Sequence, residues 1–489
     1  MFEKIIPEKA GISSRHVLKF MKELDTFSPG THGMIMMRGG KVFHECYYEP
    51  FDENFKHRMY SISKSFVGIA MGILIGDGSV RLEDKMLKFF PEYVTGDESE
   101  YIKELTIHDM LTMSTAATSY IDWFRQNTDD RCKMYFKEEH RRIPGTIFEY
   151  DSPAAYMLGV IVEKISGKTF LKLMQERFLD DAGFSKDAYC LNAPGGYSLG
   201  DSGVMCTLRD LVVFAKFLMD GGRVNGEARM DSDYIRAATT KQVDNNSFGL
   251  NNYSNQGYGY QIWMSYDGAF SFNGMGGQFA VCDPKHDFIF ALNADNQGNV
   301  GSNYGVFQAL YTNIIANLGD TLAEDSDALN ELFEYSASRK LCVQRGTLTS
   351  DFSDSINGVI YKMDSNPMGI ENIRIDIDGD EGKFTYTNAT GEKVIPFGFG
   401  HNVFSLFPEE GYSDMTAGAP CPGNKYKCAC SAVWAEPKKL RIKVLIIDKY
   451  FGGAAFTFSY KDNRVALQMT KNAEAFLDEY SGMAMGKAE

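Results

Sequence analysis

The spacing of apolar residues changes along this chain, and the change limits which folding units it can form. Between residue 61 and about residue 240, apolar residues recur at helical spacing, as in "SKSFVGIAMGILIG", "SPAAYMLGVIVEKISG" and "TLRDLVVFAKFLMDGG". From about residue 257 the pattern is that of strands, as in "GYGYQIWMSY", "QFAVCDP" and "DFIFALNAD". Near the N-terminus, "THGMIMMRGGKVFHECYYEP" holds two strand-like runs around a Gly-Gly turn, so this hairpin can join a sheet with the later strands.

These patterns predict an α/β fold of the α+β kind, with an antiparallel sheet flanked by helices and a helical subdomain. Residues 345–489 alternate short β-branched and aromatic runs with turn signals, which predicts a separate small antiparallel β-barrel. A chain of 489 residues has room for two to three domains. We therefore expect a first domain over residues 1–325, an acidic linker over 326–344 and the barrel over 345–489.

The composition narrows the class of protein. The formal net charge is -15, so the average surface potential repels nucleic acid and anionic lipid. The start "MFEKIIPEKAG" lacks the basic and apolar regions of a secretory signal, and the longest apolar runs are broken by glycine or charge before they could span a bilayer. We expect a cytoplasmic protein without nucleic-acid or membrane partners, and the sequence leaves homo-oligomer formation open.

The nine cysteines favour reduced thiols over a disulfide framework, because their number is odd and no export signal is seen. Cys421, Cys428 and Cys430 cluster in "CPGNKYKCAC", but this spacing matches no closed zinc site, and a turn near solvent is expected there. The eight histidines are scattered without an H-E-x-x-H motif. The sequence thus predicts neither a metal nor a cofactor.

One short motif, "YSISKS" at residues 60–65, contains a candidate nucleophile. Ser61 and Lys64 are the only serine and lysine of this stretch at S-x-x-K spacing, and on a helix residues i and i+3 share a face. Lysine can take the proton of a serine hydroxyl when burial favours its neutral form. At a helix start, the N–H of Ser61 would also be free to bind an oxyanion. The alternative is a capping serine beside a solvated lysine.

Two further segments add candidate residues. Tyr150 lies in "PGTIFEYDSPAAYMLG", in an extended stretch just before a predicted helix, although a core tyrosine would look the same. In "FNGMGGQFAVCDP", Gly274, Gly276 and Gly277 stand at the start of a strand, where a backbone without side chains can approach a ligand. A β-bulge or turn would explain the glycines equally well.

Together these residues resemble the serine β-lactamase and penicillin-binding-protein-like hydrolases, nearest to the class C β-lactamase and esterase branch. That family carries S-x-x-K at the start of a buried helix, then Y-x-N, then a K-T-G or H-x-G box on a strand. The order and wide separation match over roughly residues 5–320. The resemblance implies that Ser61 is acylated, that Lys64 is its general base and that Tyr150 relays protons. It also implies an oxyanion hole made by the N–H groups of Ser61 and Gly277.

The sequence departs from the family pattern at two positions of the substrate site. Ser152 stands where the family has Asn and cannot offer an amide to both the lysine and the substrate. Gly274, followed by Met275 and Gly276, stands where many members have Lys or His, so the cation that meets a β-lactam carboxylate is missing. The pattern therefore favours a small ester or amide as substrate, as in esterases and 6-aminohexanoate-oligomer hydrolases.

The resemblance leaves two functions open. One is an active serine hydrolase, and the other is a degenerate binding or sensor protein that acylates without turnover; the presence of Ser61, Lys64 and Tyr150 together favours the first. The C-terminal segment resembles the lipocalin-like barrel found behind some of these hydrolases, with an open role.

Overall fold

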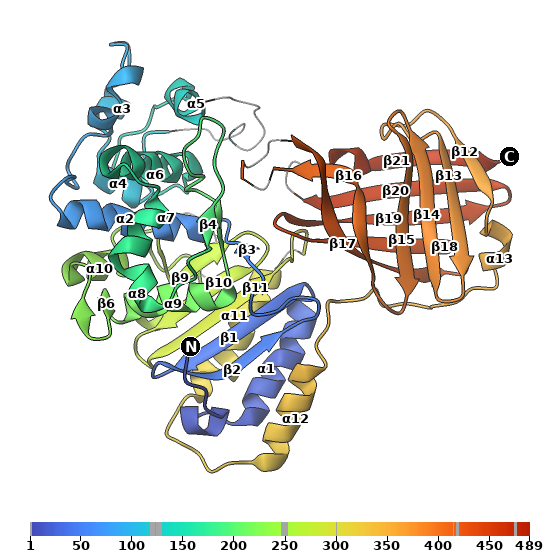
Figure 1. Cartoon of the computed structure of the whole chain (residues 1–489), viewed down its shortest axis with the longest axis horizontal. Helices are drawn as coiled ribbons and strands as arrows, with labels where there is room; N and C mark the ends of the chain where they lie inside the picture. The colour runs from blue at the N-terminus through green and yellow to red at the C-terminus, as the bar shows by residue number, and fades with distance from the viewer. Residues whose placement is uncertain are drawn as a thin grey trace. The chain divides into compact units, whose positions relative to one another are not determined.

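The computed structural model divides the chain into two compact units (Figure 1). It describes residues 2–117, 123, 130–245, 253–299, 301–413, 415–416, 420–473 and 477–489. The first unit comprises Met1–Leu341 with Met415–Ala417, and the second comprises Cys342–Asp414 and Gly418–Glu489. Within the described ranges, every helix is too short or too polar to cross a membrane.

A six-stranded antiparallel sheet forms the centre of the first unit, in the order β2-β1-β11-β10-β9-β8. As predicted, the N-terminal hairpin joins the later strands, because β1 pairs with β11 in a register that sets Met34 opposite Leu292. The strands are β1 (Thr31–Arg38), β2 (Lys41–Tyr47), β8 (Trp263–Met264), β9 (Phe270–Gly274), β10 (Gln278–Asp283) and β11 (Phe288–Ala294).

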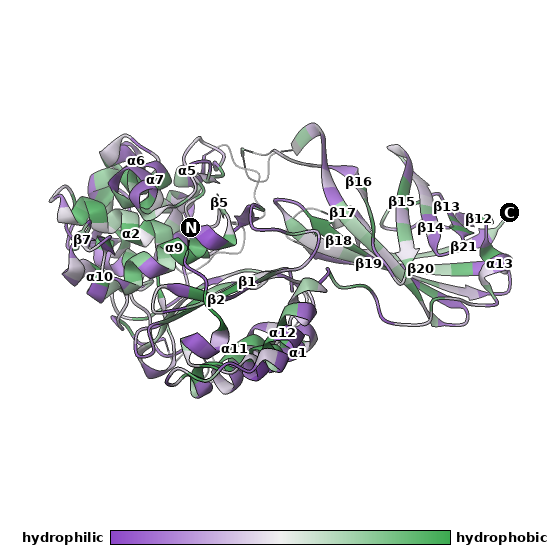
Figure 2. Cartoon of the chain, turned by 60° about the horizontal axis from the view of Figure 1, so that its bottom comes forward, coloured by the Kyte–Doolittle hydropathy of each residue, from purple (hydrophilic) through white to green (hydrophobic). Residues whose placement is uncertain are grey.

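Three helices cover one face of this sheet: α1 (Ser14–Phe27), α11 (Ser302–Asn313) and α12 (Ser326–Ala337), seen together below β1 and β2 in Figure 2. The helix α12 lies within the segment expected to be a linker. Its residue Leu332 is buried in the same core as Leu24 of α1, and Lys22 pairs with Glu331 across the two helices. The acidic composition that suggested a linker belongs to the outer face of an amphipathic helix.

The helical subdomain carries most of the remaining helices of the first unit. Its longest members are α2 (Ile62–Gly76), α6 (Ser152–Ser166) and α9 (Leu208–Met219). The rings of Phe66 in α2 and Phe214 in α9 stack 3.9 Å apart, and Phe214 also contacts Phe272 of β9. The helix that follows the candidate nucleophile Ser61 is thereby packed toward the sheet. Shorter elements are α3 (Glu100–Glu104), α4 (Ile107–Leu111), α5 (Arg131–Lys137), α7 (Phe170–Met174), α8 (Asp180–Ala182), α10 (Ser232–Ala238), β3 (His57–Arg58), β4 (Tyr189–Cys190), β5 (Val204–Cys206), β6 (Arg223–Val224) and β7 (Glu227–Ala228).

The second unit is the predicted β-barrel. Its strands form one sheet in the order β15-β14-β13-β12-β21-β20-β19-β18-β17-β16, and a parallel pairing of β15 with β17 closes nine of them into a ring. The elements are α13 (Ser353–Ile356), β12 (Ile360–Met363), β13 (Asn372–Asp378), β14 (Glu381–Asn388), β15 (Gly391–Phe399), β16 (Val403–Tyr412), β17 (Pro420–Glu436), β18 (Lys439–Ile447), β19 (Phe451–Lys461), β20 (Arg464–Ala473) and β21 (Gly482–Ala488).

The cysteine cluster corrects one expectation. Cys421, Cys428 and Cys430 lie in the long strand β17, not in a turn near solvent. Cys428 and Cys430 are buried on the same face, because residues two apart in a strand point the same way, and their sulfur atoms lie 3.8 Å apart. The antiparallel pairing of β17 with β18 holds this segment in the sheet, with Cys428 opposite Ile446 and Cys430 opposite Val444.

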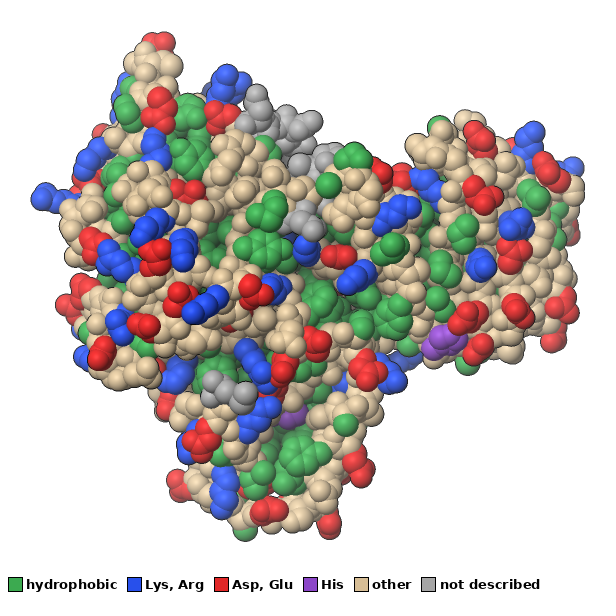
Figure 3. Space-filling view, viewed as in Figure 1, with side chains coloured by type: hydrophobic (Ala, Val, Ile, Leu, Met, Phe, Trp, Pro, Cys, Tyr) green, Lys and Arg blue, Asp and Glu red, His purple; other side chains and the backbone are tan. Residues whose placement is uncertain are grey.

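Acidic and basic side chains alternate over the visible face of the first unit (Figure 3). On this face the charged side chains therefore do not form one acidic field.

Candidate functional site

The candidate nucleophile Ser61 stands at the N-cap of α2, directly after a strained residue. Tyr60 has a φ of 47°, in the left-handed region that non-glycine residues rarely adopt, and its side chain is buried with the Arg58 guanidinium 4.7 Å from its ring. The side chain of Ser61 makes no capping bond to the helix. Among the described residues its N–H also has no acceptor, so both groups are available for chemistry.

Lys64 lies one turn further along α2 and is 1% exposed. Its Nζ is 3.0 Å from Oγ of Ser61 and donates a 2.6 Å hydrogen bond to the backbone oxygen of Asp201. It is also 5.0 Å from the centre of the Tyr150 ring. The helical spacing that suggested this pair in the sequence thus brings the two side chains into contact.

Tyr150 lies in an extended stretch before α6, as expected. Its ring stacks on Trp263 of β8 at 5.3 Å and 25°, so the ring lies between this indole and the amine of Lys64. Phe148 and Tyr258 pack behind Trp263 in the same apolar cluster. The Tyr150 hydroxyl makes no hydrogen bond to any described residue, which leaves it free to meet a substrate.

The helix α6 begins at Ser152, two residues after Tyr150. Asp151 caps it by accepting a 2.7 Å hydrogen bond from the N–H of Ala154, and it accepts another from the hydroxyl of Thr115. Burial raises the pKa of Asp151 to about 6, although these two hydrogen bonds oppose the shift. Ser152 is buried in the first turn, and it forms no hydrogen bond with Lys64 among the described residues.

The glycine box forms the tight turn between β9 and β10. A Cβ at Gly274 would clash with the backbone oxygen of Met59, so the end of β9 lies directly against the segment that leads to Ser61. The N–H of Gly277 donates to the backbone oxygen of Gly274 at 3.3 Å and is therefore used within the turn. In the described part of the chain, the N–H of Met275 has no such acceptor.

A second set of contacts extends outward from Lys64 and was missed in the sequence. Asp201, whose backbone oxygen binds Lys64, is fully buried, and its carboxylate accepts hydrogen bonds from Nε1 of Trp123 at 3.0 Å and from the hydroxyl of Ser202 at 3.3 Å. Trp123 is also fully buried and lies 5.6 Å from the ring of Tyr156. The only sequence signal was the Gly-Asp-Ser-Gly turn at residues 200–203, which does not reveal its partner.

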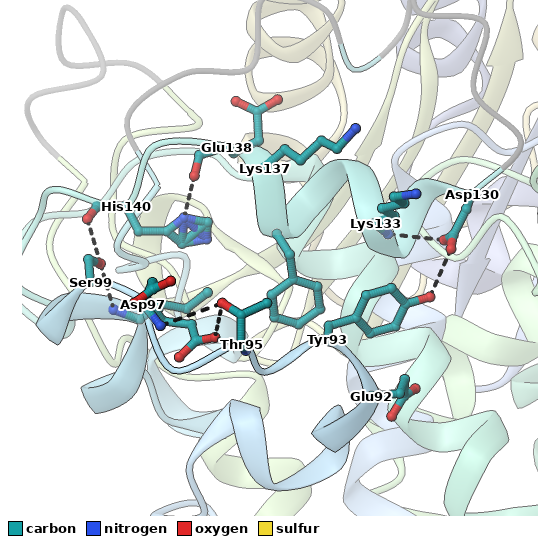
Figure 4. A pocket seen from close by; sticks show the side chains of 13 residues that line it. Glu92, Tyr93, Thr95, Asp97, Ser99, Asp130, Lys133, Lys137, Glu138 and His140 are labelled. Atoms are coloured by element: carbon teal, nitrogen blue, oxygen red, sulfur yellow. Dashed lines mark hydrogen bonds between the residues drawn. The ribbon is translucent and has the colours of Figure 1, made fainter.

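A separate cavity of about 670 Å³ lies between α5 and the segment that leads into α3 (Figure 4). Tyr93 and Phe136 stack on its wall at 5.0 Å, and the Tyr93 hydroxyl donates to Asp130, the N-cap of α5. None of Ser61, Lys64 and Tyr150 lines it. Among the described residues, no group of three or more His, Cys, Asp or Glu side chains could hold a metal.

Comparison with known proteins shows which family the chain belongs to. The family model described as Beta-lactamase matches residues 28–305, more than half of the chain. The chain belongs to the beta-lactamase family. A family member from Paenarthrobacter ureafaciens, named 6-aminohexanoate-dimer hydrolase, is 24% identical over 284 residues, which cover 53% of this chain and 71% of the relative. A beta-lactamase from Pseudomonas fluorescens is 25% identical over 139 residues, which cover 28% of this chain and 37% of that protein.

A solved structure supports the fold. A provisionally named 6-aminohexanoate-dimer hydrolase from Bacillus anthracis superposes with a TM-score of 0.55 at 19% identity, covering 65% of this chain and 88% of the other. The predicted β-lactamase-like fold of the present chain is thus confirmed. The relatives named above are hydrolases.

Proposed function

We propose that this chain is a serine hydrolase that cleaves a small amide or ester through an acyl-enzyme on Ser61. The observation that carries the proposal is the 3.0 Å contact between Nζ of Lys64 and Oγ of Ser61 at the start of a buried helix. A serine hydroxyl needs a base within this distance to become a nucleophile. The 6-aminohexanoate-dimer hydrolase among its relatives favours a linear amide over a β-lactam.

In the acylation step, Oγ of Ser61 attacks the carbonyl carbon of the substrate while Nζ of Lys64 takes the hydroxyl proton. The negative charge moves to the carbonyl oxygen, which the free N–H of Ser61 can bind. The tetrahedral intermediate then collapses, and the leaving amine or alcohol takes a proton from the Tyr150 hydroxyl. Lys64 returns a proton to Tyr150, whose ring centre lies 5.0 Å from its amine.

Deacylation repeats these steps with water as the nucleophile. The water gives a proton to Nζ of Lys64 through the Tyr150 hydroxyl, which passes on its own proton as it accepts one. The water oxygen bonds to the acyl carbon, the bond between this carbon and Oγ breaks, and Oγ of Ser61 takes the proton from Lys64. The free Tyr150 hydroxyl supports this role, because no described side chain competes for it.

For the second oxyanion donor we propose the N–H of Met275 in place of Gly277. The Gly277 N–H is used in the turn, whereas that of Met275 has no acceptor among the described residues. Met275 also follows Gly274, which lies against the backbone just before Ser61. An oxyanion held between Ser61 and Met275 would sit at the point where β9 meets the start of α2.

Labelling by a fluorophosphonate probe tests the proposal. We expect one adduct per chain, located on Ser61 by peptide mass spectrometry, and steady release of 4-nitrophenol from 4-nitrophenyl acetate. The variant Ser61→Ala should lose both. Ser63→Ala is the matched control, because Oγ of Ser63 accepts a hydrogen bond from the N–H of Val204 and takes no part in the chemistry.

Labelling that persists in Ser61→Ala would contradict the assignment of the nucleophile. A stoichiometric burst of 4-nitrophenol without further turnover would instead identify the sensor protein as the correct alternative.

A further inference from the structure

A row of positive charges crosses four neighbouring strands on the outside of the barrel, β19, β20, β21 and β12 (Figure 1). In the register of these strands, Lys461 lies opposite Arg464, and Arg464 lies opposite Lys487. Lys487 in turn lies opposite Lys362. Directly opposite residues point to the same face of a sheet, and all four of these residues are exposed. Because neighbouring strands are spaced about 4.8 Å apart, the row presents one positive charge about every 5 Å.

This row is left without internal counter-charges. None of its four cations forms an ion pair with a described residue. Like charges directly opposite each other destabilise a sheet, and here such pairs follow one another across the row. Elsewhere on the barrel the same geometry is balanced, since Lys383 lies opposite Asp376. An anion bound along the row would remove the repulsion.

Three of the cations, Lys461, Arg464 and Lys487, line a hollow of about 480 Å³. Ser459 also lines it and can offer a hydroxyl to a ligand. Among the described residues of the lining, Asp364 is the only acidic one, and it forms no ion pair with the three cations. The hollow therefore has a net positive lining, in a chain whose net charge is -15.

The charge density of the row favours phosphoryl groups over other anions. A phosphate monoester carries a charge of roughly -1.5 to -2 at pH 7 and three acceptor oxygens, so one group can bind two or three cations. An extended acidic peptide would face the row only at every second residue, roughly 6.7 Å apart, with a single charge each time. Single-stranded nucleic acid also requires aromatic side chains for base stacking, and none of the described residues lining the hollow is aromatic.

We propose that Lys461, Arg464 and Lys487 bind a phosphoryl-bearing anion, either a free oligophosphate or the headgroup of a phospholipid. Arg464 is flanked by the two lysines, and its planar guanidinium can bind two oxygens of one phosphoryl group. The lysines supply point charges on both sides, and Lys362 extends the row for a longer anion. This site lies within the second unit and does not depend on the chemistry proposed for Ser61.

Calorimetric titration of the full chain with tripolyphosphate, in about 0.15 M salt, tests the site. We expect one site per chain and a loss of affinity of about 10-fold or more in Arg464→Gln, the effect of one charge-assisted contact. Lys383→Gln is the matched control, because it removes an exposed positive charge from another strand of the same barrel, and it should bind as the wild type does.

Three further probes identify the source of the anion. Vesicles of phosphatidylcholine with phosphatidylglycerol that bind the wild type but not Arg464→Gln, while tripolyphosphate binds neither, would assign the site to a phospholipid headgroup. Hexaglutamate that binds as tightly as tripolyphosphate would overturn the choice of a phosphoryl group. Binding of a single-stranded oligonucleotide alone, or no binding of either tripolyphosphate or vesicles, also overturns the proposal.

The melting temperature gives a second readout. Without a ligand and at low salt, Arg464→Gln should melt at a higher temperature than the wild type, because it removes both like-charge contacts of Arg464. The probe that binds should raise the melting temperature of the wild type more than that of Arg464→Gln. An equal rise in both proteins, or equal affinity in the titration, would show that the row is not the binding site.

Discussion

The backbone oxygen of Asp201 accepts a 2.6 Å hydrogen bond from Nζ of Lys64. A carbonyl oxygen can only accept, so this contact always consumes an N–H of the lysine. A neutral amine has two N–H groups and one lone pair, and the contact with Asp201 therefore leaves the lone pair free to face Ser61. We propose that this orientation directs Lys64, as a base, toward Oγ of Ser61.

Replacement of Lys64 by methionine keeps the volume of the side chain and removes its amine. We expect Lys64→Met to lower the rate of Ser61 acylation by about 100- to 10,000-fold, the usual contribution of a positioned base. The measurement is stopped-flow release of 4-nitrophenol. Lys164→Met is a matched control, because Lys164 also donates to a backbone oxygen, that of Phe89, but is not part of the site. Acylation near the wild-type rate in Lys64→Met would make another group the base.

Removal of the Tyr150 hydroxyl is a clean test, because the ring contacts with Trp263 and Lys64 do not involve it. We expect Tyr150→Phe to keep the melting temperature and to lower kcat for amide substrates by about 100-fold or more, since a poor leaving group needs a proton donor. Tyr258→Phe makes the same change in the same aromatic cluster and should leave kcat unchanged. Full amidase activity in Tyr150→Phe would remove the proposed proton relay.

A methyl group at Gly274 should disturb both the fold and the chemistry. The new Cβ would clash with the backbone oxygen of Met59, so either β9 or the segment before Ser61 has to move. We expect Gly274→Ala to cost about 1–3 kcal/mol of unfolding free energy, typical of overpacking, and to reduce acylation of Ser61. Urea unfolding and probe labelling measure the two effects. Gly76→Ala, at the end of α2 with open space around it, should be neutral; equal behaviour of the two variants would contradict the packing argument.

The buried Asp151 carboxyl predicts a pH dependence of stability. Its pKa is raised to about 6, so between its unfolded value near 4 and pH 6 the folded state binds more protons than the unfolded state. Stability from this group is therefore present below pH 4 and is lost as the pH rises through 6. The shift of roughly two units corresponds to about 3 kcal/mol.

Asp151→Asn tests this sign, because asparagine also caps helices but does not titrate. Relative to the variant, wild-type protein should lose up to about 3 kcal/mol of unfolding free energy between pH 4 and pH 7. Urea unfolding at several pH values is the measurement. Parallel stability curves for the two proteins would show that Asp151 is not the titrating group.

Local patterns were predictable, and long-range partners were not. The contact between Ser61 and Lys64 follows from helical spacing over three residues, and the barrel strands follow from alternation. The contact of Lys64 with Asp201 joins residues 137 positions apart, and the stacking of Tyr150 on Trp263 joins a loop to a strand. No periodicity encodes such pairs, because they depend on how whole elements pack.

Two local expectations also depended on tertiary structure. The segment at residues 326–337 was taken as part of an acidic linker, and only the structure shows that it is a helix in which Leu329 and Leu332 are buried. The glycines at positions 274, 276 and 277 belong to a turn between β9 and β10, which was the alternative left open by the sequence, and Gly274 also lies against the backbone of Met59. The sequence did not show which N–H groups of this segment lack an acceptor. That depends on the turn, in which the N–H of Gly277 donates to the backbone oxygen of Gly274.

The left-handed conformation of Tyr60 places a strained residue directly before Ser61, the proposed nucleophile. A non-glycine residue in this region costs about 1–3 kcal/mol, and here the burial of the tyrosine ring beneath Arg58 offsets that cost. The fold therefore stores strain one residue before Ser61. Under the proposed mechanism, a substitution that relieves this strain at position 60 should raise stability and slow acylation of Ser61.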